Sequence, residues 1–168
     1  VLGQVKPVLA VVADVVAHER KHRHRIPADG ADLALGGGGL LGSSEVGMVR
    51  ALAEHGIRPD VVLGTSIGAM NGAFIAADPG VEGAERLAAV WEAVVREGVF
   101  LDNPMRQAAR VAKYRTHLLS NAPLRHVIER YLPVSRFEEL EVAFQCVAAC
   151  IEDSSGRWFT DGDLTDAV

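Results

Sequence analysis

The spacing of apolar positions along the chain changes between a helical and a strand period, and this change predicts its elements. Short apolar runs at residues 31–35 and 58–64 predict buried strands, and residues 44–55 between them have helical periodicity and end at Gly56. A strand, a helix and a strand within about 30 residues form a βαβ unit. We therefore expect these two strands to be parallel neighbours in one sheet.

The same pattern extends to the end of the chain. Helical spacing predicts further helices over 67–77, 83–97, 104–119 and 123–131. The period then shortens and predicts a strand over 141–153, a turn at 154–156, a return strand over 157–162 and a new helix from 163. The sequence thus predicts an α/β fold with a parallel-sheet core and flanking helices.

The first part of the chain reads as a separate amphipathic helix over residues 4–24. We divide the chain into a helical extension, 1–28, and a main domain, 29–168. The helix ends in a basic, histidine-rich stretch, which we interpret as a solvated helix end that complements the helix dipole. A second interpretation is that residues 20–25 contact anionic lipid headgroups at a membrane surface. His18 and His22 lie one turn apart without a third ligand, so we expect no metal site.

Composition narrows the class of protein. The 168 residues suffice for one ordinary core, and the net charge of -5 argues against a nucleic-acid partner. No apolar run reaches the length of a membrane span, and the apolar start lacks the basic leader of a signal peptide. Cys146 and Cys150 lie in an apolar run and are expected to be buried free thiols. We expect a cytoplasmic protein that is peripheral to a membrane if the basic segment binds lipid.

Candidate chemistry begins at Gly64-Thr65-Ser66-Ile67-Gly68, between a predicted strand and a predicted helix. In that position the motif predicts a nucleophile elbow, a tight turn that exposes the Ser66 hydroxyl. Gly64 and Gly68 let the strand and the helix approach closely, and the helix N-terminus favours negative charge on a substrate oxygen. The alternative is a serine that only caps the helix.

A glycine run after the first strand favours the catalytic interpretation. Gly37, Gly38 and Gly39 offer backbone N–H groups that no side chain blocks, as an oxyanion hole requires. In a parallel sheet this loop and the Ser66 turn emerge at the same edge and should face each other. The run also matches the dinucleotide fingerprint G-x-G-x-x-G, with Gly42 as its last glycine. Dinucleotide binding requires an acidic residue near the end of the second strand to bind the ribose. Asp60 lies at the start of that strand instead, which argues against this interpretation.

The segment "LALGGGGLLGSSEVGMVRALAEHGIRPDVVLGTSIGAMNGAFIA" resembles the patatin-like phospholipases, strongly over residues 32–78 and weakly beyond. The resemblance implies an α/β-hydrolase-related fold and a serine acyl hydrolase that acts on lipid esters through a Ser–Asp dyad, without histidine or cofactor. It makes Ser66 the nucleophile, places the oxyanion hole in the loop and supplies the motif glycines, which are Gly37, Gly38, Gly39, Gly42, Gly64 and Gly68.

The chain departs from the family pattern at two places. The family loop commonly carries Arg or Lys where this chain has Leu41, so backbone donors alone would stabilise an oxyanion. The family aspartate stands in Asp-Gly-Gly or Asp-Gly-Ala, and neither Asp161 nor Asp163 continues in that way. We expect both to be turn and cap residues, and the dyad aspartate to lie beyond Val168, which would leave the domain incomplete at its C-terminus and this piece nearly inactive.

Histidine is not expected to replace that aspartate. His55, His117 and His126 each stand alone in a polar helical stretch, which is typical of surface residues.

The sequence leaves two candidate functions. The first is hydrolysis of a carboxylic ester in a phospholipid or related lipid, and the second is a catalytically silent module of the same fold that associates with lipid or membrane.

Overall fold

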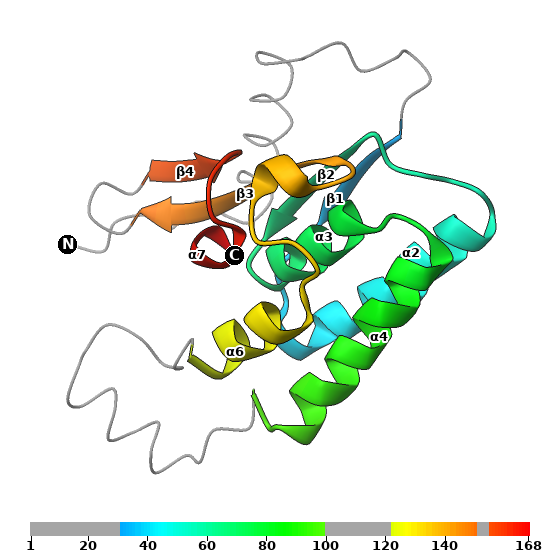
Figure 1. Ribbon diagram of the computed structural model, residues 1–168, viewed down its shortest axis with the longest axis horizontal. Helices are drawn as coiled ribbons and strands as arrows, with labels where there is room; N and C mark the ends of the chain where they lie inside the picture. Colours follow the sequence, from blue (N-terminus) through cyan, green and yellow to red (C-terminus); the bar gives the residue numbers. More distant parts are fainter. Residues whose placement is uncertain (1–30, 100–121, 151–154) are drawn as a thin grey trace. The chain divides into compact units, whose positions relative to one another are not determined.

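The structure, a computed structural model, describes residues 31–99, 122–150 and 155–168 (Figure 1). The strands are β1 (Asp32–Leu35), β2 (Val61–Thr65), β3 (Ala143–Cys150) and β4 (Ser155–Phe159). The α-helices are α2 (Ser43–Glu54), α3 (Ile67–Ala77), α4 (Val81–Arg96), α6 (Ala122–Tyr131) and α7 (Leu164–Ala167). Two 3-10 helices are present, η1 (Gly39–Gly42) and η2 (Phe137–Glu139). The helices expected over 4–24 and 104–119, including the basic segment 20–25, lie outside the described residues.

The four strands form one mixed sheet in the order β1-β2-β3-β4. β1 pairs with β2 and β2 with β3 in parallel, whereas β4 returns antiparallel to β3 (Figure 1). The predicted α/β class and the parallel pairing of the first two strands are confirmed. In this register Leu35, Gly64 and Cys146 are neighbours across three strands, so the loops after β1 and β2 begin at the same edge of the sheet.

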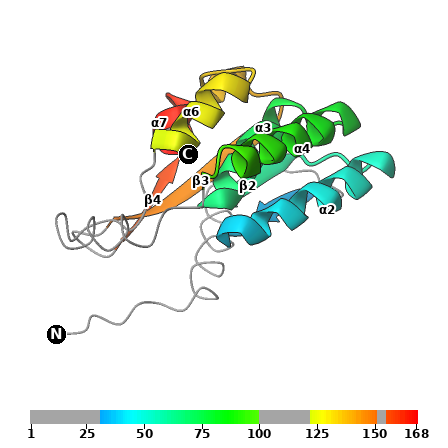
Figure 2. The ribbon, with the colours of Figure 1, turned by 90° about the horizontal axis from the view of Figure 1, so that it is seen from below.

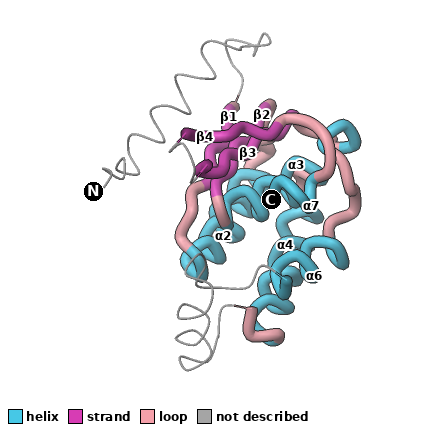
Figure 3. Tube along the Cα trace, turned by 90° about the vertical axis from the view of Figure 1, so that its left-hand side faces the viewer, coloured by secondary structure: helices cyan, strands magenta, loops and turns pink. Residues whose placement is uncertain are grey.

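The described helices lie on one face of this sheet (Figure 3). Strand order and chain order agree for β1, β2 and β3, and the right-handed crossovers that parallel strands favour would bring the described connecting helices to the same side. Helix α3 packs directly against β2 and β3, and α4 packs on α2 and α3 (Figure 2). Helix α3 is the centre of the core, because ten of its eleven residues are buried.

Several local expectations need correction. Residues 154–156 were expected to form a turn, but Ser155 and Gly156 belong to β4, where they pair with Cys150 and Ala149. Neither 3-10 helix was expected, and α4 begins at Val81 instead of residue 83. Cys146 is a buried free thiol as predicted, whereas Cys150, which was also expected to be buried, is only half-buried.

Candidate active site

Ser66 occupies a strained turn between β2 and α3. Its φ of 55° and ψ of -125° make it the one non-glycine residue with positive φ in the described ranges. Such a conformation costs about 1–3 kcal/mol and persists only where the surroundings enforce it. Here β2 is paired on both sides, and the carbonyl of Ser66 accepts hydrogen bonds from the N–H groups of Ala69 (2.8 Å) and Met70 (3.4 Å). The residue is exposed between buried Gly64 and buried Ile67, so the turn presents its side chain to solvent.

Two glycines permit this turn by their small size. A Cβ at Gly64 would lie 2.5 Å from the Cα of Ala69, inside the first turn of α3. A Cβ at Gly68 would overlap the carbonyl group of Leu35 at the end of β1. Real Cβ atoms do not tolerate such contacts, because backbone atoms cannot rotate away. The start of α3 is therefore pressed against both neighbouring strands.

The glycine loop, defined here as residues Gly36–Gly42, lies beside this turn. A Cβ at Gly37 would lie 3.2 Å from the Cβ and 3.8 Å from the Oγ of Ser66. Gly38 and Gly39 come less close, since an added Cβ there meets only Leu41 or nothing within 4 Å. Of the three glycines proposed from the sequence, the structure therefore brings Gly37 into contact with the serine.

The backbone N–H groups of this loop differ in their hydrogen bonding. The N–H of Gly36 donates to Oε1 of Glu45 at 3.0 Å. The N–H groups of Gly37 and Gly38 donate to no other residue in the described part of the chain. Of these two donors, the N–H of Gly37 belongs to the residue whose added Cβ would meet Ser66, whereas Gly38 lies farther from the serine. Gly42 has a different role, because it is buried and an added Cβ there would overlap the side chain of Ile67.

Sequence reasoning missed a polar network behind this loop. Asn71 is fully buried in α3. Its Nδ2 donates to the carbonyl of Gly42 (2.9 Å) and to Oε2 of Glu45 (2.8 Å), and its Oδ1 accepts from Nε1 of Trp91 (3.0 Å). The signal in the sequence is a single amide inside the apolar run "IGAMNGAFIAA", since a buried polar group requires partners.

Two candidate bases for Ser66, Asp163 and His55, have other hydrogen-bond partners. Asp163 is the N-cap of α7, and its Oδ1 accepts from the N–H of Asp166 at 3.0 Å, which agrees with the expected cap role. His55 ends α2 with its ring nitrogen 2.7 Å from the carbonyl of Ala51. In the ranges that the structure covers, no hydrogen bond links the Ser66 hydroxyl to a carboxylate or an imidazole. His117 lies outside those ranges.

The rim of the glycine loop is apolar. Leu40 and Leu41 in η1 are 49% and 78% exposed, and Met48 on α2 is also exposed. Large apolar side chains in contact with water favour an apolar ligand or surface. Leu40 and Leu41 lie on the same loop as Gly37, and Met48 follows on the next helix.

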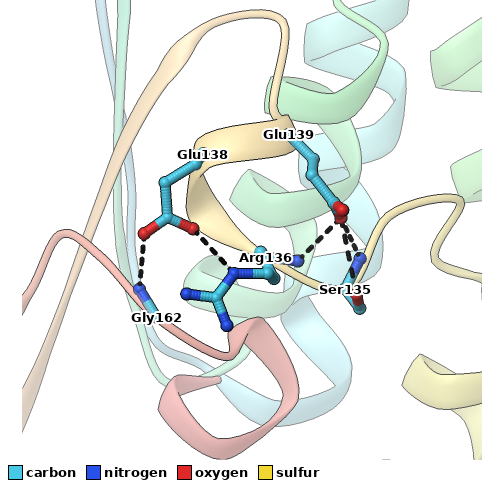
Figure 4. A network of polar contacts seen from close by, with 5 residues as sticks. All are labelled: Ser135, Arg136, Glu138, Glu139 and Gly162. Carbon is cyan, nitrogen blue, oxygen red and sulfur yellow. Dashed lines mark hydrogen bonds and ion pairs between the residues drawn. The ribbon is translucent and has the colours of Figure 1, made fainter.

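A second polar network surrounds η2 and does not include Ser66 (Figure 4). Hydrogen bonds from the N–H groups of Ser135 (2.9 Å) and Arg136 (3.1 Å) lower the pKa of the Glu139 carboxyl. A hydrogen bond from the N–H of Gly162 (3.1 Å) lowers the pKa of Glu138 in the same way. This network joins η2 to the turn before α7. Glu139 also lines a hollow of about 500 Å³ beside α6, to which no residue of the glycine loop contributes.

Fold and site together define an α/β domain with a solvent-facing serine on a strand-to-helix turn and an open glycine loop beside it. The family model described as "Patatin-like phospholipase" matches residues 33–168. The chain therefore belongs to the patatin-like phospholipase family.

Named relatives agree with this assignment. The chain is 32% identical over 132 residues to the mouse "Patatin-like phospholipase domain-containing protein 7", a match that covers 79% of the chain and 9% of the relative. It is 31% identical over 132 residues to "Patatin-like phospholipase domain-containing protein ZK370.4" of Caenorhabditis elegans, with the same coverage. It is 55% identical over 49 residues to "Lysophospholipase nte1" of Aspergillus terreus, which covers 29% of the chain and 3% of the relative. The chain thus spans less than a tenth of the length of these relatives.

The described helices are also short or polar relative to a membrane span. Within residues 31–99, 122–150 and 155–168, every helix is too short or too polar to cross a bilayer.

Proposed function

We propose that this chain provides the nucleophile and the oxyanion hole of a serine hydrolase that cleaves carboxylic esters of phospholipids or related lipids. The observation that carries this proposal is the strained, exposed Ser66 with Gly37 of the glycine loop in contact with it. Strain of this kind is retained where function requires it. The apolar rim of Leu40 and Leu41, and the lysophospholipase name of the fungal relative, support a lipid substrate.

In the proposed reaction the Ser66 Oγ attacks the ester carbonyl carbon and gives its proton to a general base. The negative charge on the carbonyl oxygen is stabilised by backbone donors of the glycine loop, with no cationic side chain at Leu41. The bond from the carbonyl carbon to the alcohol oxygen then breaks, and the alcohol takes the proton from the base. Water attacks the acyl-serine in the same way, which releases the fatty acid and restores Ser66.

The general base in this proposal is an aspartate that follows Val168, as the family resemblance implies. Its support is that Asp163, one of the two alternatives within this chain, already serves as a helix cap. An Asp-Gly-Gly or Asp-Gly-Ala in the reading frame after Val168 would support the dyad. We also propose a cytoplasmic enzyme that meets its substrate at a membrane surface, with residues 20–25 contacting anionic headgroups.

The test is serine-directed labelling of the full-length protein with a fluorophosphonate probe, together with hydrolysis of phospholipid and lysophospholipid esters. We expect both signals to depend on Ser66 and to vanish in Ser66→Ala, with the protein still folded. Esterase activity that persists in Ser66→Ala would overturn the choice of nucleophile.

A second candidate function is a catalytically silent module that binds lipid. It is favoured by the lack of a hydrogen-bonded base at Ser66 in the described part of the chain. A folded full-length protein that binds lipid vesicles but neither labels nor hydrolyses esters would establish it in place of the enzyme.

A further inference from the structure

Both ends of the glycine loop are tied to one pair of side chains. At the start of the loop, the N–H of Gly36 donates to Oε1 of Glu45. At its end, the carbonyl of Gly42 accepts from Nδ2 of Asn71. Glu45 and Asn71 are joined directly, because the same Nδ2 donates to Oε2 of Glu45 at 2.8 Å. A carboxylate from α2 and an amide from α3 therefore bridge the two ends of the loop.

The orientation of the Asn71 amide follows from its partners. Trp91 Nε1 can only donate, so the atom that faces it must be the amide oxygen. The carbonyl of Gly42 can only accept, so the amide nitrogen must face the loop. Trp91 belongs to α4, and its hydrogen bond fixes the amide from the side opposite the loop. All the hydrogen-bonding atoms of this buried side chain are thus engaged by three different segments.

The loop needs such an external tie. Glycine loses more conformational freedom on folding than any other residue, and Gly36–Gly39 form an unbroken run. Without side chains the run cannot anchor itself by packing, and an added Cβ at Gly36 or Gly39 meets nothing within 4 Å. Hydrogen bonds to an ionised carboxylate are stronger than those between neutral groups. Glu45 also lies in the first turn of α2, where the helix dipole favours its negative charge.

We propose that Glu45 and Asn71 are positioning residues for catalysis, which hold the N–H of Gly37 beside Ser66. Glu45 accepts from the N–H of Gly36, immediately before Gly37, and Asn71 lies on the helix that directly follows Ser66. The pair therefore connects the loop to the nucleophile turn. Neither residue contacts the substrate. This inference rests on the proposed function, because it assigns a task within the same site.

The decisive variant is Glu45→Gln in the full-length protein. Glutamine has the size of glutamate, but only one of its two terminal atoms is an acceptor. Its NH2 group would face either the N–H of Gly36 or the Nδ2 of Asn71, so one of these two hydrogen bonds is lost. Displacement of a reacting group by about 1 Å can lower the rate roughly 100-fold. We expect kcat for a soluble short-chain ester to fall about 10- to 100-fold, with KM changed less than about threefold.

Glu54→Gln is the matched control. Glu54 lies on the same helix, but it is exposed and pairs with Arg50 at 2.8 Å on the surface. Its variant should retain kcat within about twofold, since exposed pairs of this kind contribute little. Asn71→Ala and the double variant Glu45→Gln/Asn71→Ala complete a cycle. Because both residues act through one loop, the loss in the double variant should be smaller than the product of the single losses.

A second readout is independent of activity. Amide hydrogen exchange in residues 36–42 should be about tenfold faster in Glu45→Gln and unchanged in Glu54→Gln. A merely structural role would lower the unfolding midpoint without a selective fall in kcat at temperatures where the variant is folded. If Asn71→Ala does not fold, the kcat and the loop exchange of Glu45→Gln still test the positioning role.

Folded Glu45→Gln with kcat and loop exchange like the wild type would overturn the inference, and so would a loss confined to KM. The result for Ser66→Ala distinguishes a failure of the positioning role from a failure of the proposed function. Activity that survives Ser66→Ala refutes the function, whereas activity that needs Ser66 but not Glu45 refutes only the positioning role.

Discussion

The backbone of Gly68 lies against the carbonyl group of Leu35, so the first turn of α3 touches the last residue of β1. Any side chain at position 68 would meet main-chain atoms of Leu35 and Gly36, which cannot rotate away. This contact sets the distance between the start of the glycine loop and Ser66. A substitution there should therefore affect both stability and chemistry.

We expect Gly68→Ala to lower the free energy of unfolding by about 3 kcal/mol, the upper part of the range for an overpacked site. The control is Gly47→Ala on α2, where an added Cβ meets nothing within 4 Å. Alanine should stabilise that exposed helical position by about 0.5–1 kcal/mol. Urea unfolding of the two variants measures both effects. Equal stabilities would show that α3 can move away from β1.

The backbone strain at Ser66 predicts a variant that gains stability and loses activity. Glycine adopts positive φ without a steric penalty, whereas alanine retains most of the strain of serine. Ser66→Gly should therefore be more stable than Ser66→Ala by about 1 kcal/mol, and neither should hydrolyse esters. The measurement is urea unfolding of both proteins. A less stable Ser66→Gly would mean that the turn is not strained.

The carboxyl of Glu139 predicts a pH dependence of stability. Its pKa in the folded protein is lowered by the N–H groups of Ser135 and Arg136 (Figure 4). A lowered pKa stabilises the fold fully above the unfolded value of about 4.3, and the contribution disappears as the pH falls through the folded pKa. Glu139→Gln should therefore be less stable than the wild type at pH 7, with a difference that shrinks toward pH 3.

Urea unfolding at several pH values between 7 and 3 measures this difference. Glu92→Gln is a suitable control, because Glu92 is exposed on α4 and forms no ion pair with another residue of the described ranges. A difference for Glu139→Gln that does not change with pH would contradict the role of its ionised form.

The apolar rim predicts a difference between aggregated and soluble substrates. Transfer of an exposed leucine into lipid contributes about 1.5–3 kcal/mol, so Leu41→Ser should weaken vesicle binding by roughly tenfold or more. Hydrolysis of a soluble short-chain ester should change little, because the loop backbone is kept. Vesicle sedimentation and esterase assays measure the two effects.

Ile57→Ser is the control for that experiment. Ile57 is 45% exposed, but it precedes β2 and lies at the end of the strand opposite Ser66. Its variant should bind vesicles like the wild type. An equal loss for both variants would indicate general apolar adhesion instead of a defined rim.

Those parts of the fold that depend on local patterns could be predicted from the sequence. The βαβ unit and α3 follow from apolar spacing, and the turn at Ser66 follows from glycines at a strand-to-helix junction. The positions of Ser155 and Gly156 could not be predicted in this way. Their composition favours a turn, but pairing with β3 places them in a strand, so tertiary contacts override local preference.

The residues of the candidate site also differ in whether the sequence could predict them. Ser66 and the loop glycines are visible because their chemistry requires a short motif. Glu45 and Asn71 belong to no motif, since their roles come from hydrogen bonds between segments that the fold brings together. Asn71 stands out only as a polar residue in an apolar helix, and nothing in the sequence names its partners.

The burial of α3 has a consequence for the interpretation of natural variants. The helix that directly follows Ser66 is also the centre of the core, with ten of its eleven residues buried. A harmful substitution on this helix will reduce the amount of folded protein and the rate per folded molecule together. A loss of function caused by a variant in this segment will therefore not show by itself whether folding or catalysis is impaired. The amount of folded protein must be measured together with the turnover rate to separate the two causes.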